Sequence, residues 1–91
     1  MTNISHFTKD PHATVQYTIR WTAWLGSDTI SSSSWTVPAG ITNVSESNDT
    51  LDANIFLASG TVGTIYPVTN SIVTAAGQKN DQTISIFIQN K

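Results

Sequence analysis

The strongest constraint on the fold of this chain is a period-two alternation of apolar and polar residues that returns along most of its length. Successive side chains of a β-strand point to opposite faces of a sheet, so this spacing predicts strands that bury one face. Apolar spacing of three and four, which indicates a helix, is not sustained over ten residues, and no helix is expected. The clearest alternating sets are Val15, Tyr17, Ile19 and Trp21; Tyr66, Val68, Asn70 and Ile72; and Ile84, Ile86 and Ile88.

Glycine, proline and small polar residues divide these strands at nearly regular intervals. The predicted strands cover residues 13–21, 29–37, 41–46, 51–57, 65–75 and 81–89, and the predicted turns or loops cover 22–28, 38–40, 47–50, 58–64 and 76–80. Six to seven short strands in this pattern predict an all-β fold, an immunoglobulin-like antiparallel β-sandwich with Greek-key connections.

The length of 91 residues allows one domain. We expect residues 13–91 to form the sandwich and residues 1–12 to form an N-terminal arm or a first edge strand. Residues 1–10 contain neither an apolar run nor a basic lead-in, so no secretory signal is expected. No stretch approaches the ~20 apolar residues of a membrane span, and no membrane partner is expected.

The chain is poor in charge, with 11% charged residues and a net charge of −2. Its cations are Lys9, Arg20, Lys79 and Lys91. Binding to a duplex requires a basic face that neutralises several phosphates, so no nucleic-acid partner is expected. The sequence has no cysteine, which excludes disulfides, thiolate metal sites and a cysteine nucleophile.

The residues that could carry catalysis or hold a metal are few. His6, Asp10 and His12 form a loose trio in the segment with the weakest periodicity, where histidines are usually solvated. Glu46, Asp49 and Asp52 form the acidic cluster, which lacks the dense oxygen-ligand spacing of a calcium loop. We therefore expect no catalytic residue, no metal and no cofactor, and a protein that is not an enzyme.

Four aromatic residues have contrasting expected roles. Trp21 and Trp35 lie on apolar alternating faces and are predicted core residues. Tyr66 follows a Gly turn at the start of a strand, which predicts a tyrosine corner whose hydroxyl bonds back to the preceding loop. Trp24 lies three residues after Trp21, so on an extended chain it points outward.

An outward Trp24 beside Leu25 is a candidate anchor for a protein contact, a stacking platform for a sugar, or a cover over one end of the sandwich. Phe7, in the N-terminal arm, is a further candidate for protein contact. Phe56 joins this set because it opposes the alternation of its strand.

Several segments in combination resemble small virion proteins of tailed bacteriophages. They are DPHA (10–13), YTIRW (17–21), WLGSDTI (24–30), SWTVPAG (34–40), SGTVGTIYPVTN (59–70) and TAAG (74–77). The resemblance extends from about Asp10 to Phe87 and is to the group of fiber-tail adaptors and small head-tail structural proteins. It implies an immunoglobulin-like fold and carries no catalytic residues. Pro67, just after the corner tyrosine, predicts a strand start at an edge or a bulge.

The resemblance implies a non-enzymatic structural protein of the virion, an adaptor that links the tail or neck to a fiber. The expected partners are other virion proteins, namely tail, neck or fiber subunits, in a symmetric assembly of several copies. The expected location is the virion, and the host cytoplasm during assembly. Two alternatives remain: a capsid decoration or head-fiber module, and a carbohydrate-binding module.

Overall fold

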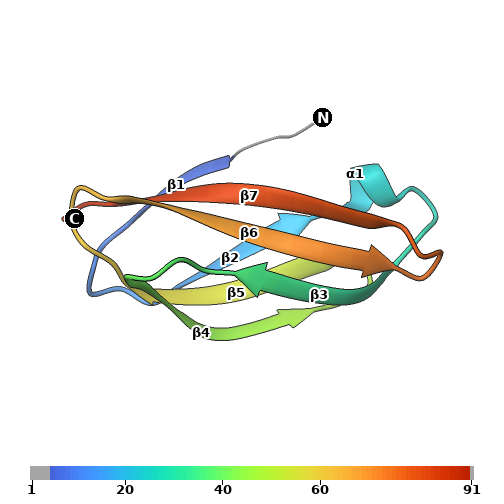
Figure 1. Ribbon diagram of the computed structural model, residues 1–91, viewed down its shortest axis with the longest axis horizontal. Coiled ribbons are helices and arrows are strands. Elements are labelled where there is room, and N and C mark those ends of the chain that lie inside the picture. The colour runs from blue at the N-terminus through green and yellow to red at the C-terminus, as the bar shows by residue number, and fades with distance from the viewer. Residues whose placement is uncertain (1–4, 91) are drawn as a thin grey trace.

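A computed structural model describes residues 5–90, with side chains placed from Phe7 onward. Its elements form two facing sheets and one short helical turn (Figure 1). In chain order they are β1 (Ser5–Lys9), β2 (Val15–Arg20), α1 (Thr22–Leu25), β3 (Ile30–Thr36), β4 (Ile41–Asn48), β5 (Asp52–Ser59), β6 (Ile65–Thr74) and β7 (Lys79–Ile88). The all-β prediction is confirmed.

The four-stranded sheet has the order β1-β7-β6-β3, and the three-stranded sheet has the order β2-β5-β4. Only the β4–β5 and β6–β7 connections are hairpins within one sheet, whereas the other connections pass between the sheets. The result is an elongated sandwich of 41 × 25 × 20 Å. Two sheets and seven strands agree with the predicted sandwich, while its immunoglobulin-like class stays a prediction.

The core lies between the sheets and follows from the period-two alternation. In β6 the buried positions are Tyr66, Val68, Asn70, Ile72 and Thr74, of which the sequence predicts the first four. The side chains of Ile84, Ile86 and Ile88 on β7 face those of Ala53, Ile55 and Leu57 on β5, and each is at most 1% exposed. Trp21 and Trp35 are also core residues, at 3% and 9% exposed.

Three expectations about the elements are wrong. β1 pairs with β7 in parallel, so the sandwich is not entirely antiparallel, because alternation fixes which face is buried but not strand direction. Residues 22–25 form α1, a single turn too short to show a helical period, in which Trp21 O accepts from the N–H groups of Trp24 and Leu25. β4 continues to Asn48, two residues into the predicted loop.

Tyr66 has the geometry of a tyrosine corner. Its hydroxyl accepts the backbone N–H of Thr61 at 3.0 Å, which fixes the β5–β6 loop to the start of β6. Its ring lies against Gly40, where an added Cβ would be 3.0 Å from the ring and hydroxyl. Pro67 belongs to an interior strand, but β3 pairs with β6 only from Thr69 onward, so at Pro67 the strand has β7 as its one sheet neighbour.

Lys9 is a buried cation at the end of β1. Its side chain is 1% exposed, and its ammonium donates to the carbonyls of Asp10 at 2.9 Å and Ser59 at 2.7 Å. Burial lowers the pKa of Lys9, and the neighbouring Asp10 carboxylate opposes that shift. Since Ser59 ends β5, the lysine connects the two sheets.

Candidate functional site

Exposed apolar side chains are the main feature of the described surface, and they fall into separate groups. The large apolar residues that are exposed are Phe7, Trp24, Val44, Leu51, Phe56, Val62, Ile65 and Phe87. Among the residues that the structure describes, no group of three potential metal ligands lies together.

The first group, here called the helix-end surface, consists of Trp24 and Leu51. Trp24 is 41% exposed and stands edge-on to the buried Trp21, with ring centroids 5.7 Å apart at 68°. Leu51, in the β4–β5 loop, is 38% exposed, and its carbonyl accepts a hydrogen bond from the backbone N–H of Trp21 at 3.0 Å. Trp21 thus holds both residues in place, so the exposed indole is presented on a rigid base.

Leu25 does not belong to this surface. Its side chain is 7% exposed and is part of the core cluster. The expectation of an outward pair assumed an extended chain, but the turn of α1 rotates Leu25 back toward the sheets while Trp24 stays outside. Its side chain is a core anchor of α1 and is not available for an outside contact.

The second group, here called the sheet-face patch, lies on the outer face of the four-stranded sheet. Ile65 on β6 and Phe87 on β7 are register partners, and Thr8 on β1 pairs with Phe87 from the other side. Ile65 is 61% exposed and Phe87 is 37% exposed. Such cross-strand neighbours have adjoining side chains, so these residues form one continuous strip across three strands.

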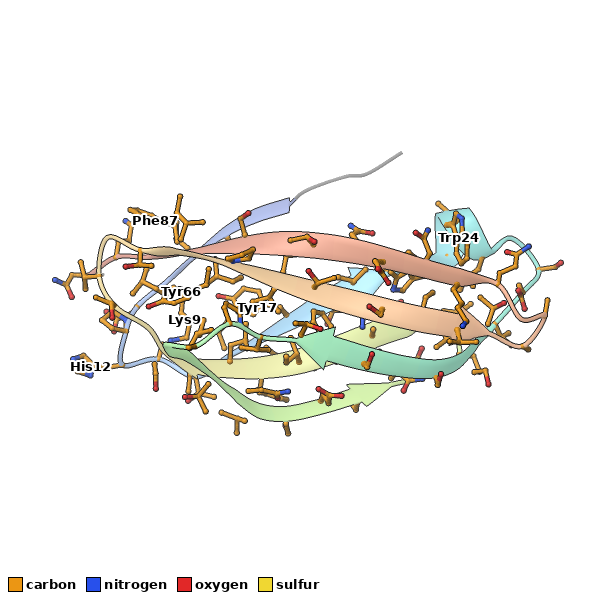
Figure 2. All side chains as sticks on the ribbon, viewed as in Figure 1. Lys9, His12, Tyr17, Trp24, Tyr66 and Phe87 are labelled. Atoms are coloured by element: carbon orange, nitrogen blue, oxygen red, sulfur yellow. The ribbon has the colours of Figure 1, made fainter. Side chains whose placement is uncertain are left out.

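The helix-end surface and the sheet-face patch lie toward opposite ends of the long axis. Figure 2 shows Trp24 beside α1 at one end and Phe87 near Tyr66 and Lys9 at the other. With a principal extent of 41 Å, the sandwich is long enough for each surface to meet a different neighbour. The two surfaces are built on separate elements, so they can be altered one at a time.

Phe56 faces outward on the three-stranded sheet, as its position in the alternation predicts. It is 39% exposed and pairs with Gln16 on β2 and Ser45 on β4. Beside it, Thr18 donates a 2.7 Å hydrogen bond to Asn54 Oδ1. The nearest register partners of the Phe56 ring are therefore uncharged polar residues.

Phe7 has a different setting from the other exposed aromatics. It is 36% exposed, but its ring lies 5.0 Å from the Tyr17 ring at 57°. Phe7 shares the side of β1 that carries the buried Lys9, so it covers the open edge of the core. More than half of the Phe7 surface is already buried within the molecule.

The charged candidates for metal binding have structural partners. Asp49 Oδ1 accepts the N–H groups of Leu51 at 2.8 Å and Asp52 at 2.7 Å, which closes the β4–β5 hairpin. These hydrogen bonds lower the pKa of Asp49. The trio of His6, Asp10 and His12 includes a side chain, that of His6, outside the described residues, and Asp10 Oδ1 accepts the His12 N–H at 2.8 Å.

The sequence reasoning missed Leu51, Ile65 and Phe87. Ile65 and Phe87 occupy the outward positions of their strands, next to the inward Tyr66, Ile86 and Ile88. An apolar residue on the polar side of the alternation was the available signal, the same one that identified Phe56. The strand predicted over residues 51–57 includes Leu51, but in the structure β5 begins one residue later, at Asp52.

A comparison with protein families identifies the class of protein as a structural adaptor of bacteriophage tails, through a family model that matches residues 9–87. The chain belongs to this family, Gp77, which is described as the Podophage GP4 fiber-tail adaptor protein gp77. The resemblance to fiber-tail adaptors is thereby confirmed over most of the chain. The description of the family indicates a structural role in the phage tail.

No curated protein matches the chain. Among solved structures, the chain is similar to part of the 2,6-sialyltransferase of Vibrionaceae Photobacterium sp. JT-ISH-224, solved as a ternary complex with the donor product CMP and the acceptor substrate lactose. The TM-score is 0.61 at 10% identity, and the match covers 99% of this chain but 18% of that one. This likeness concerns the fold alone.

None of the helices in the described part of the chain has the length and apolar character needed to cross a membrane.

Proposed function

We propose that this protein bridges two virion components, with the helix-end surface on one and the sheet-face patch on the other, and that it links the tail or neck to a fiber. The observation that carries the proposal is the position of two exposed apolar surfaces at opposite ends of one rigid sandwich. An adaptor has to hold two neighbours at once, which requires two surfaces that do not overlap. Membership of the adaptor family supports this reading.

The chemistry of both surfaces suits protein contacts. Trp24 is of the residue type most often found as an interface anchor, and its position on Trp21 leaves little conformational freedom to lose on binding. In the sheet-face patch, Ile65 and Phe87 offer apolar area with Thr8 beside them and no charge at these register positions. A partner can therefore cover the sheet-face patch without removing water from an ion at these positions.

The test uses three variants of the full chain. W24A alters the helix-end surface, the double variant I65S/F87S alters the sheet-face patch, and F56S is the matched control on the other sheet face. These side chains are all exposed, so the variants should stay folded, which thermal unfolding checks. Each variant is then assayed for retention on purified fiberless tails and, separately, on purified fibers.

The expected result is that W24A loses one partner, I65S/F87S loses the other, and F56S keeps both. Loss of the same partner by both variants, or of none, would contradict a bridge through these surfaces. Cryo-electron microscopy of particles should show the sandwich between tail and fiber. Density on the capsid shell would instead support a decoration module, and loss of glycan retention by W24A would support carbohydrate binding.

A further inference from the structure

The free edges of the two sheets differ in how well they are protected against pairing with another chain. Among the described residues, β1 and β3 border the four-stranded sheet, and β2 and β4 border the three-stranded sheet. An edge strand exposes unpaired N–H and C=O groups, and proteins usually blunt such edges with charge, proline, a bulge or short length. An edge without these devices is open to the addition of a strand.

Three of the four edges carry such devices. β1 has only five residues and ends at Lys9. β2 ends at Arg20. β4 has a break in register between Asn43 and Ser45, and it carries Glu46.

β3 is the exception. From Ile30 to Thr36 it reads ISSSSWT, with no charge and no proline. Its register irregularity is confined to its start, between Ile30 and Ser32, where the Ile30 N–H is already bonded to Thr50 O at 2.8 Å. The five residues from Ser32 to Thr36 form a regular ladder with β6, and among the described residues no strand is hydrogen-bonded to their other edge.

We propose that two copies of this chain associate by antiparallel pairing of β3 with β3 across a two-fold axis at Ser34, which joins their four-stranded sheets into one continuous sheet. The strand that pairs with the free edge of β3 comes from a second copy, because an uncharged strand can meet itself without placing like charges opposite one another. The low net charge of −2 keeps repulsion between whole copies small. A two-fold pairing also closes on itself and leaves no β3 edge for a third copy.

The hydrogen bonding of Ser34 sets this register. The Ser34 carbonyl accepts from Asn70 Nδ2 on β6 at 3.0 Å, so it is turned toward β6. Backbone groups of successive residues in an antiparallel ladder point to alternate sides, which leaves those of Ser33 and Trp35 facing the free edge. With Ser34 on the axis, Ser33 and Trp35 of one copy pair with Trp35 and Ser33 of the other.

The same register suits the side chains on the outer face. Ser32, Ser34 and Thr36 are exposed, and all three carry hydroxyl groups. The axis places Ser34 opposite Ser34 of the second copy, and Ser32 opposite Thr36. Hydroxyl pairs of this kind form favourable cross-strand contacts. An interface of one short strand pair is small, so the association should be weak and fully reversible.

The inference does not depend on the proposed bridge, because β3 belongs to neither the helix-end surface nor the sheet-face patch. It adds a route by which several copies can strengthen attachment through avidity. W24A and I65S/F87S should leave self-association unchanged, so the failure of one proposal can be told apart from the failure of the other.

The test measures the mass of the full chain by sedimentation equilibrium from micromolar to millimolar concentration. The wild-type mass should rise from 9.8 kDa toward twice that value and stop there. S34K and S34E each place like charges opposite each other at the axis, and each should weaken association by about fivefold or more. An equimolar mixture of S34K and S34E should recover the heavier species, because opposite charges then face each other.

The matched control is S47K, which adds the same charge to the exposed edge strand β4 and should associate as the wild type does. Amide hydrogen exchange at residues 32–36 should slow as concentration rises. A wild-type chain that stays at 9.8 kDa throughout overturns the proposal. So does an S34K variant that associates normally, or a mixture of S34K and S34E that stays monomeric.

Discussion

The indole N–H of Trp21 donates a 2.9 Å hydrogen bond to the side-chain oxygen of Asn70, and so joins the end of β2 to β6 across the core. Asn70 is fully buried, and its amide nitrogen donates to Ser33 Oγ at 2.8 Å and to Ser34 O at 3.0 Å. The chain has no cysteine, so this polar cluster provides a specific connection between the sheets where no disulfide can form.

Replacing Asn70 tests that connection. Asn70→Ala should lower the free energy of unfolding by about 2–4 kcal/mol, because it leaves the buried indole N–H of Trp21 unpaired and opens a cavity. Urea denaturation followed by tryptophan fluorescence measures the change. Asn43→Ala, at an exposed position on β4, is the control and should change stability by less than about 0.5 kcal/mol. Equal losses in the two variants would count against the role of the cluster.

Gly60 is required for two separate reasons, and Gly77 isolates one of them. Both have positive φ, +109° and +89°, but only at Gly60 would an added Cβ meet another group, Ile88 Cγ1 and Cδ1 at 2.7 Å. Gly77→Ala should cost about 1–2 kcal/mol for backbone strain alone. Gly60→Ala should cost about 2–4 kcal/mol, because Ile88 is fully buried and has little room to move.

Chemical denaturation of the two glycine variants gives the comparison directly. Combining Gly60→Ala with Ile88→Val, which shortens the side chain in the way, should recover part of the additional loss. If the changes in the free energy of unfolding caused by Gly60→Ala and Ile88→Val simply add in the double variant, the steric explanation is wrong.

Tyr17 is a buried phenol whose hydroxyl has no hydrogen-bond partner among the described residues. Tyr17→Phe removes a polar atom that is already unsatisfied, so at neutral pH it should change stability by less than about 0.5 kcal/mol or raise it. Tyr66→Phe is the contrasting control and should lower the melting temperature, since the Tyr66 hydroxyl is bonded to the Thr61 N–H.

Tyr17 should also govern part of the loss of stability at alkaline pH. Burial raises the pKa of Tyr17 above its ordinary value of 10.0, so above that pH the unfolded chain releases a proton that the folded chain retains. Stability is therefore lost as pH rises past that value. Melting curves from about pH 8 to 11 should fall less steeply for Tyr17→Phe than for the wild type. Parallel curves would show that the phenol does not contribute.

Asp49 should contribute to stability with the opposite dependence on pH. Its bonds to the N–H groups of Leu51 and Asp52 lower the pKa of the carboxyl below 3.8. Its contribution is complete above the unfolded value and is lost as pH falls through the folded one. Asp49→Asn can keep the turn while it removes the charge, so its melting temperature should decline less between about pH 5 and 2. A fall in melting temperature identical to that of the wild type would show that the Asp49 carboxylate does not contribute to the pH dependence.

Side-chain alternation made most of the core predictable, because burial of one face follows from period two whatever the strand order. Tyr66, Val68 and Asn70 were placed correctly for this reason. What alternation does not contain is which strands are neighbours or in which direction they run. The parallel pairing of β1 with β7 was missed because it joins residues about as far apart in sequence as the chain allows.

The contact surfaces could also be predicted only in part from the sequence. Trp24 and Phe56 could be placed outside from spacing alone, but Leu25 could not be placed correctly, since one helical turn reverses the direction that an extended chain predicts. The sheet-face patch depends on the cross-strand neighbours Thr8, Ile65 and Phe87, which only the register brings together.

The pairing of β1 with β7 also has a consequence for synthesis. Ser5 lies beside Ile84 and Lys9 beside Ile88, so β1 leaves the ribosome well before β7, its partner in the sheet. The sandwich cannot close until β7 has left the exit tunnel, and β1 must wait until then with its backbone unpaired. A domain of this topology therefore completes its fold only once all of its strands are outside the ribosome.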